Sequence, residues 1–227
     1  MEGPSAVGKT TWCRAHLPAG SVDEVRDNIE APDLYADPAE VSRFWVNFNI
    51  ERWQAALRIE EHRGLAICDG DPFHLYFSWS LWKAGLIPSR LFAMELPLYR
   101  RAIQDRRLGL ADLVCWREAP LDELRRRAKS DPTRRRRRHE TYLSLIPWMK
   151  VWFEMRERAL PGTVRDWPDD LTAEQLSVSP APAVRYDVRV VDQWMESLSC
   201  AWNHADLAQA AGLGNRNFLC PLIRMRL

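Results

Sequence analysis

The sequence predicts an α/β fold in which parallel strands alternate with helices, so that one sheet lies between helical layers. Three observations predict it: a glycine-rich motif at residues 3–10, short apolar runs that end in acidic residues, and stretches of helical spacing between them. The chain has 227 residues, 46% of them hydrophobic, and a formal net charge of +1. This composition suits one globular domain with a small appendage, and the overall charge selects no class of partner.

Residues 3–10, Gly-Pro-Ser-Ala-Val-Gly-Lys-Thr, match the full motif of a phosphate-binding loop. Glycines permit turns that a Cβ would obstruct, the lysine neutralises β- and γ-phosphate charge, and the threonine hydroxyl is a ligand for Mg²⁺. A helix that begins near the lysine adds its positive end. We therefore expect ATP and Mg²⁺ as cofactors and a nucleotide bound by Gly3, Ser5, Gly8, Lys9, Thr10 and Thr11. A glycine turn without a nucleotide is the alternative.

The motif lies close to the start of the sequence. A phosphate-binding loop normally follows a buried parallel strand, and only Met1 and Glu2 precede Gly3. We expect this first strand to be missing or truncated, and we favour a shortened N-terminus. The alternative is that Val184–Val191, which has a strand-like composition, fills the position.

Further elements follow from turn residues and hydrophobic spacing. Strands are predicted at 20–25, 65–68, 112–116 and 163–167, and helices at 11–17, 39–63, 73–107 with breaks at Pro88 and Pro97, 121–128, and 134–160. From about residue 177 the composition becomes that of a linker, and the segment behind it has no clear place in the alternation. We therefore divide the chain into a domain at 1–176 and a linker with a tail of uncertain role at 177–227.

Acidic residues follow two of the predicted strands. Asp69 and Asp71 come after the apolar run 65–68, where at least one carboxylate should reach Mg²⁺ directly or through water. Asp23 and Glu24 end the preceding strand, and Glu24 is our first choice for the base that takes a proton from a substrate hydroxyl. An ordinary Asp-Gly-Asp turn and a solvated loop acid or helix cap are the competing interpretations.

Five consecutive arginines at 134–138 form the most basic segment. Such a run usually indicates a solvated face or an electrostatic patch for nucleic acid. Its place between two helices, late in the predicted domain, favours a mobile lid near 129–141 that closes over transferring phosphates. Two or three of its arginines can face the site at once.

The predicted helix 39–63 mixes aromatic rings with amide side chains. A stacked base that is read by an amide would use this combination, although core packing is the commoner role of aromatics at such spacing. The candidate amides are Asn47, Asn49 and Gln54. The five cysteines show no pattern of a disulfide framework or a zinc site, and no apolar run is long enough to cross a bilayer. We expect a cytoplasmic protein whose partner is a small-molecule acceptor and not a nucleic acid or a membrane.

Taken together, these residues resemble the P-loop nucleoside and nucleotide kinases, particularly deoxynucleoside kinases and thymidylate kinases, over about residues 3–176. The resemblance implies a three-layer sandwich around a parallel sheet. It gives the role of base to Glu24, although Val25 stands where a proline is usual. An acid-arginine pair usually closes the third strand, and here Asp69 matches the acid while Gly70 replaces the arginine. The lid pattern Arg-x-Arg-x-x-Glu is met by Arg135, Arg137 and Glu140.

The leading hypothesis is an ATP-dependent kinase that transfers the γ-phosphoryl group to a small molecule, most plausibly a nucleoside or nucleotide. Its catalytic residues are expected to be Lys9, Glu24, Asp69, Arg135 and Arg137, and its metal ligands Thr10, Asp69 and Asp71. A second hypothesis changes the acceptor to an antibiotic, a sugar or another metabolite. A third is an NTP-dependent regulator or nucleic-acid-binding protein that uses the arginine run as a patch for polyanions. The oligomeric state is not predicted.

Overall fold

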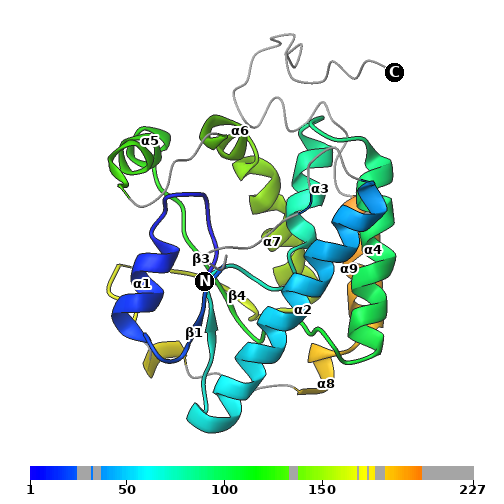
Figure 1. Cartoon of the computed structure of the whole chain (residues 1–227), viewed down its shortest axis with the longest axis horizontal. Helices are drawn as coiled ribbons and strands as arrows, with labels where there is room; N and C mark the ends of the chain where they lie inside the picture. Colours follow the sequence, from blue (N-terminus) through cyan, green and yellow to red (C-terminus); the bar gives the residue numbers. More distant parts are fainter. Residues whose placement is uncertain are drawn as a thin grey trace.

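The computed structural model describes residues 1–24, 32, 37–132, 138–167, 169–172, 174–176 and 182–200. The described chain is an α/β structure with mostly helices and small parallel sheets (Figure 1). Its strands are β1 (Ser21–Val22), β2 (Ile67–Cys68), β3 (Val114–Trp116) and β4 (Val164–Asp166). Its helices are α1 (Lys9–His16), α2 (Pro38–Arg63), α3 (Leu75–Lys83), α4 (Ser89–Gln104), α5 (Leu121–Ser130), α6 (His139–Leu143), α7 (Ile146–Ala159), α8 (Pro182–Arg185) and α9 (Val188–Cys200). A 3₁₀ turn, η1, spans Glu174–Leu176.

Two parallel strand pairs, β1 with β2 and β3 with β4, are joined by the first two residues of the chain. The Met1–Glu2 segment forms backbone hydrogen bonds on both of its sides. These are Met1 N to Cys68 O (2.8 Å), Gly70 N to Met1 O (3.0 Å), Glu2 N to Cys115 O (2.8 Å) and Arg117 N to Glu2 O (3.1 Å). Glu2 also makes a parallel bridge with Trp116. The spatial order across the structure is therefore β1, β2, the Met1–Glu2 segment, β3, β4.

The position of the expected first strand is thus filled by two residues. The prediction that Val184–Val191 could serve instead is wrong, because this stretch belongs to α8, a turn and α9. Its alternating valines suggested a strand, but Val191, Trp194 and Leu198 recur at helical spacing and are buried. Packing of this face against the rest of the protein decides in favour of the helix.

Strand β3 shows that apolar side chains cover both faces of the strands. Val114 and Trp116 join the larger hydrophobic cluster, which contains residues of α2, α3, α4, α7 and α9. Cys115, which points to the opposite face, joins the smaller cluster around α1. The continuous burial of this short strand is what a parallel strand between two helical layers requires. Figure 1 shows α1 on one side of the strands and the large helical group on the other.

Aromatic side chains dominate the larger cluster. The indoles of Trp152 on α7 and Trp194 on α9 lie 4.5 Å apart between ring centroids, and both pack against Phe73. Helix α9 therefore belongs to this core, although its residues follow the predicted linker. None of the helices in the described part of the chain combines the length and apolar character that a membrane-spanning helix requires.

Two of the predicted helix boundaries differ from the structure. Pro97 lies inside α4 and does not end it, because a helix can continue past a proline at the cost of one backbone hydrogen bond. The predicted helix 134–160 is described as two helices, α6 and α7, separated by Ser144 and Leu145. Pro147 is the second residue of α7, where its missing N–H has no intrahelical partner to lose.

We expect truncation of Trp152 to test the larger cluster. Its side chain is fully buried, so Trp152→Ala should lower the free energy of unfolding by about 3–5 kcal/mol. Leu121→Ala is the matched control, since Leu121 is 47% exposed and its loss should change stability by less than about 0.5 kcal/mol. Urea unfolding followed by circular dichroism measures both values. Equal, small losses in the two variants would contradict the packing described here.

Candidate functional site

The loop between the Met1–Glu2 segment and α1 makes several tight turns. Gly3 and Gly8 have φ angles of 143° and 107°, and Ala6 between them has a φ of 72°. A Cβ at Gly3 would lie 2.4 Å from the carbonyl oxygen of Arg117, so only glycine fits there. The Val7 amide donates to the Pro4 carbonyl at 3.2 Å. We call residues 3–8 the glycine loop.

Helix α1 begins directly after the glycine loop, at Lys9. The Lys9 side chain is buried and folds back, so that its ammonium donates to the carbonyl of Gly3 at 3.0 Å. The Lys9 ammonium thus lies against the glycine loop. The free backbone amides of the first turn of α1 lie at the other end of the same loop. Of the other predicted nucleotide contacts, Ser5 is half-buried in the loop and Thr11 is exposed on α1.

Thr10 and Asp69 meet at the end of β2. The Thr10 hydroxyl donates to Asp69 Oδ2 at 2.5 Å, although the residues are 59 positions apart in the sequence. Asp69 is fully buried, and its other oxygen, Oδ1, has no hydrogen-bond partner among the described residues. A buried carboxylate oxygen without a partner is costly, and a bound cation would compensate it. The structure therefore brings together two of the three predicted metal ligands.

Asp71, the third predicted metal ligand, has other partners. Its Oδ2 accepts from Arg156 at 2.7 Å and its Oδ1 accepts from the Phe73 amide at 3.0 Å. Both members of the ion pair are buried, and Arg156 also donates to the Ala111 carbonyl at 2.5 Å. A metal role for Asp71 stays a prediction, while the contacts present here give it a structural role between β2 and α7.

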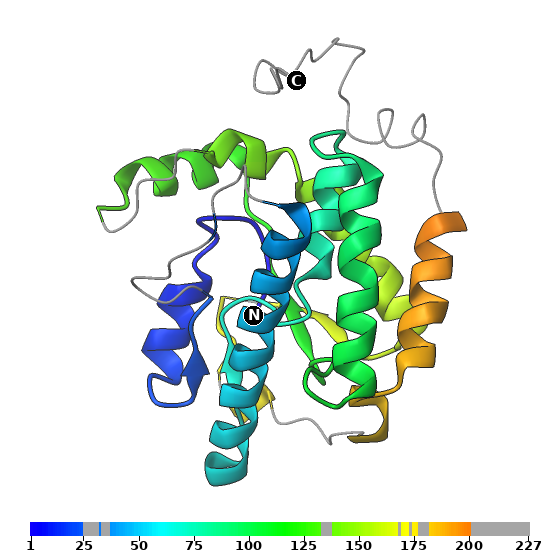
Figure 2. The same cartoon turned by 45° about the vertical axis from the view of Figure 1, so that its right-hand side comes forward.

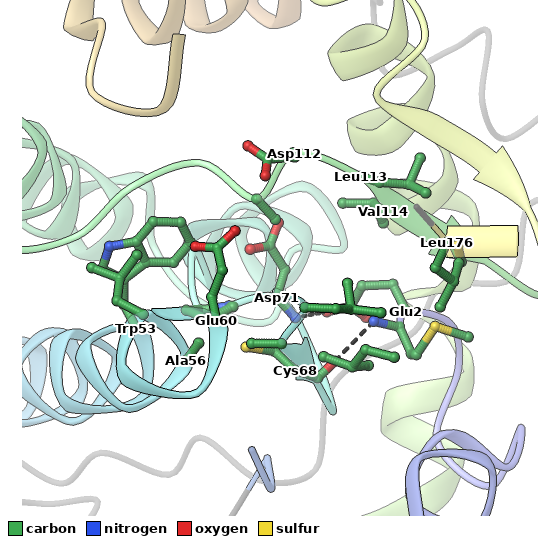
Figure 3. A pocket seen from close by; sticks show the side chains of 18 of the residues that line it. Glu2, Trp53, Ala56, Glu60, Cys68, Asp71, Asp112, Leu113, Val114 and Leu176 are labelled. Atoms are coloured by element: carbon green, nitrogen blue, oxygen red, sulfur yellow. Dashed lines mark hydrogen bonds between the residues drawn. The ribbon is translucent and has the colours of Figure 1, made fainter. Parts of the chain in front are cut away.

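Glu2 is a site residue that our reading of the sequence missed. Its carboxylate is fully buried and accepts from the Asp71 amide at 2.5 Å (Figure 3). It also accepts from the Gly3 amide at 3.2 Å. Burial raises the pKa of Glu2, and the nearby Lys9 ammonium opposes this shift. Glu2 thereby fixes the start of the glycine loop against the segment after β2. Its place directly before Gly3, where a phosphate-binding loop normally follows a buried strand, was the available signal.

Arg52 on α2 is a second missed residue. It is buried, and its guanidinium donates to backbone carbonyls at the ends of both β1 and β2. The bonds run from Nε to Asp23 O (3.0 Å), from Nη2 to Asp69 O (2.6 Å) and Gly70 O (2.7 Å), and from Nη1 to Asn49 Oδ1 (3.0 Å). Helical spacing suggested only that Arg52 lies on α2, and nothing local in the sequence indicates that its side chain reaches two strands.

Glu24, the predicted base, lies beside Gly70 at the same edge. A Cβ built on Gly70 would approach the Glu24 carboxylate to 3.5 Å, and the φ of 81° at Gly70 favours glycine. Glu24 is half-buried. Burial raises the pKa of Tyr76 well above its ordinary value, and the negative charges of Glu2 and Glu24 add to this effect. Asp23, the other candidate, forms a surface ion pair with Arg14 at 3.5 Å.

The predicted lid is described only in part. Arg135 and Arg137 lie outside the described residues, so their roles remain predictions. Helices α5 and α6, which flank them, cross above the glycine loop (Figure 2). Arg127 on α5 donates to the Val7 carbonyl at 2.9 Å, which connects this region directly to the loop. Glu140, part of the lid pattern, forms an ion pair with Arg125 at 3.0 Å.

The candidate amides on α2 take different places. Asn49 is buried and uses its amide group within the protein: it donates to Trp45 O and to the Tyr99 hydroxyl and accepts from Arg52. Gln54 donates to the Arg107 carbonyl on an exposed surface, and Asn47 is exposed. The structure therefore brings only Asn49 near the site, and it serves to orient Arg52.

A cavity of about 200 Å³ lies beside β2 and β3 (Figure 3). It is lined by residues that precede and begin these strands, such as Ala66 and Leu113, by Trp53 from α2, and on one side by Glu2 and Asp71. Ligands of open parallel sheets bind at the carboxyl ends of the strands, which is the edge that holds the glycine loop. We therefore place the candidate site at the glycine loop and not in this cavity.

His74, next to the site, gives a pH prediction. Burial lowers its pKa to about 3, and the Arg52 guanidinium adds to the shift. The folded protein therefore binds a proton at His74 more weakly than the unfolded chain does, because a histidine in an unfolded chain has a pKa of about 6.5. The neutral His74 side chain therefore makes its full contribution to the free energy of unfolding above the pKa of the unfolded chain. This contribution is lost as the pH falls toward the folded-state pKa of about 3.

We expect the free energy of unfolding to decrease from pH 6.5 to pH 4.5, and His74→Gln to reduce this decrease. Urea unfolding at pH 7.5, 6.5, 5.5 and 4.5 measures it. His62→Gln is the control, because His62 is exposed on α2. An unchanged pH profile in His74→Gln would show that this side chain is not the group that limits acid stability.

In comparisons with known proteins, no family model matches this sequence, and no curated protein matches it.

Proposed function

We propose that this protein is an ATP-dependent, Mg²⁺-requiring phosphotransferase that moves the γ-phosphoryl group to a small-molecule acceptor, a nucleoside or nucleotide. The observation that carries the proposal is the contact between the Thr10 hydroxyl and Asp69 Oδ2 at 2.5 Å, directly behind the glycine loop. A hydroxyl and a carboxylate beside a phosphate-binding loop form the protein part of a magnesium-nucleotide site. Neither residue alone would justify this assignment.

The glycine loop supports the proposal through its backbone. Positive φ angles at Gly3, Ala6 and Gly8 curve the loop, and curved loops of this kind form concave anion sites from backbone amides. Lys9 begins α1 and extends along the loop, where an ammonium can neutralise phosphate charge. The positive end of α1 adds to this field.

The order of the strands is a second, independent support. The Met1–Glu2 segment lies in the middle of the order, with β1 and β2 on one side and β3 and β4 on the other. Between β2 and β3 the chain therefore crosses from one side of the Met1–Glu2 segment to the other. Ligands of doubly wound sheets bind at such a switch point, beyond the carboxyl ends of the strands. The glycine loop begins there, which supports a P-loop kinase-like sandwich.

Thr10 and Asp69 are the residues that would hold Mg²⁺. The unpartnered Oδ1 of Asp69 fits a cation, and no group of three or more metal-binding side chains occurs among the described residues. Magnesium commonly takes one or two protein ligands and completes its shell with phosphate oxygens and water, so the pair suffices. The ion, when bound, supplies positive charge against the β- and γ-phosphates.

The remaining chemistry falls to Lys9, Glu24 and the acceptor. Glu24 accepts the proton of the acceptor hydroxyl, whose oxygen forms the new bond to the γ-phosphorus. The bond from that phosphorus to the bridging oxygen breaks, and ADP carries the electron pair away. Lys9 balances the charge that develops on the leaving phosphate. Arg135 and Arg137 are proposed to add positive charge from the lid.

The acceptor is tested by incubating the protein with γ-labelled ATP, Mg²⁺ and a panel of nucleosides, nucleoside monophosphates, aminoglycosides and sugars. Label on a nucleoside or a nucleoside monophosphate supports the proposal. Label on an aminoglycoside or a sugar supports the second acceptor class, which Gly70 favours because it leaves no cationic side chain at this point. Salt-sensitive binding to oligonucleotides without any labelled acceptor contradicts a phosphotransferase.

Replacing Lys9 tests the nucleotide site. We expect Lys9→Ala to lower phosphoryl transfer at least ~100-fold, because a buried cation that faces the phosphates is worth several kcal/mol in the transition state. Its far-UV circular dichroism should remain that of the wild type. Arg101→Ala is the control, since Arg101 is an exposed cation on α4 whose side chain is 75% exposed. Near-normal transfer by Lys9→Ala would refute the assignment.

Replacing Asp69 tests the metal site. Asp69→Asn keeps the shape of the side chain and an oxygen for the Thr10 hydroxyl but removes the negative charge. We expect the Mg²⁺ concentration at half-maximal transfer to rise about tenfold or more, because a neutral amide is a weaker magnesium ligand. Titrating Mg²⁺ at fixed ATP measures it. Asp105→Asn, at the exposed end of α4, should leave the titration unchanged.

A further inference from the structure

We propose that Arg52 is a positioning residue that holds the proposed base Glu24 in a fixed place relative to Asp69 and Thr10. This inference rests on the proposed function and deepens it. Arg52 does not contact the nucleotide or the acceptor in this proposal. It acts by joining the ends of β1 and β2, the two strands that carry the base and the metal ligand.

The contacts of Arg52 define this role. One nitrogen binds the carbonyl of Asp23, the residue before Glu24, at 3.0 Å. Another binds the carbonyls of Asp69 and Gly70 at 2.6 and 2.7 Å. The guanidinium plane therefore spans the two strand ends directly beneath the residues assigned to chemistry. A fourth bond, to the Asn49 side chain, keeps the plane in orientation.

The hydrogen-bonding capacity of Arg52 is nearly exhausted by these contacts. A guanidinium has five N–H donors, and four bonds from Arg52 are described. The side chain is also buried below the rim. Among the described residues, its charge is balanced by carbonyl dipoles and not by a carboxylate in hydrogen-bond contact. This arrangement excludes Arg52 as a direct phosphate ligand and suits a rigid connector.

Lysine cannot replace this connector. A guanidinium is planar and presents its donors in a fixed fork, whereas an ammonium is a single point on a flexible stem. An ammonium at this place would reach the carbonyls of one strand end and leave those of the other without a partner. The distance between the β1 and β2 ends would then depend on weaker contacts.

The edge around Gly70 gives this connection its chemical importance. A Cβ built on Gly70 would lie 3.5 Å from the Glu24 carboxylate, and the Gly70 amide donates to the Met1 carbonyl. Arg52 therefore fixes Gly70 on one side, and the Met1–Glu2 segment fixes it on the other. Displacement of a base by about 1 Å can cost ~100-fold in rate.

The test compares Arg52→Gln and Arg52→Lys with the wild type. Phosphoryl transfer from ATP to a mixture of the four deoxynucleosides is measured together with ATP binding by calorimetry. We expect kcat to fall about 100-fold in both variants while the Kd for Mg²⁺-ATP changes less than about threefold, since the glycine loop keeps its own contacts. Arg58→Gln is the matched control, because Arg58 is an exposed arginine on the same helix.

Hydrogen exchange separates the failure of this inference from the failure of the proposed function. The amides of Asp69 and Gly70 donate to Val22 O and Met1 O, so both should exchange faster in Arg52→Gln. The amides of Val114 and Trp167, which bind Thr163 O and Trp116 O, should keep their wild-type rates. This measurement needs no substrate.

Each combination of results has one meaning. If the wild type binds Mg²⁺-ATP and transfers phosphate, a wild-type kcat in folded Arg52→Gln or full rescue by Arg52→Lys overturns the role of Arg52. If the wild type binds no nucleotide, or binds it without transferring phosphate to any acceptor of the panel, the proposed function fails, and exchange alone decides whether Arg52 joins the two strand ends. Loss of ATP binding in step with loss of stability, with exchange accelerated everywhere, overturns positioning in favour of a general structural role.

Discussion

The insertion of two residues between two pairs of strands is the interaction on which the rest of the structure depends. Met1 and Glu2 bond to β2 on one side and to β3 on the other, and neither pair contacts the other through a described strand-to-strand ladder. Backbone hydrogen bonds contribute only about 1 kcal/mol each, so four of them form a modest link. Their importance is geometric, because they place the start of the glycine loop between Asp69 and Arg117.

This geometry explains why charged side chains are buried at one edge. Where parallel strands end, carbonyl and amide groups lose their ladder partners and must be satisfied in another way. Arg52 satisfies carbonyls of β1 and β2, and Glu2 satisfies the amides of Gly3 and Asp71. Burial of such groups costs stability unless their partners are in place. The same contacts that lower this cost also hold the edge in one conformation.

The sequence predicted the strands and the loop well, because each is a local signal. A continuous apolar run indicated β2 and β3, and the glycine motif indicated the loop before α1. It failed where distant contacts decide. Alternating valines at 184–191 suggested a strand, but burial of Trp194 and its neighbours selected a helix. Arg52 could not be recognised either, since its partners lie at the ends of two strands that come together only in the folded chain.

The charges of the described edge also constrain how a triphosphate could be bound. Glu2, Glu24, Asp69 and Asp71 contribute carboxylates, whereas Lys9, Arg52 and Arg156 contribute cations. Arg156 is committed to Asp71 and Arg52 to backbone carbonyls, so both serve the framework of the protein.

Binding several phosphate charges beside these acids therefore requires positive charge from elsewhere. In the proposed site, Mg²⁺ held by Thr10 and Asp69 would supply one part, and Lys9 and the arginines of the predicted lid would supply the rest. A nucleotide site of this kind should be strongly dependent on the metal, because its own framework neutralises so little of the ligand.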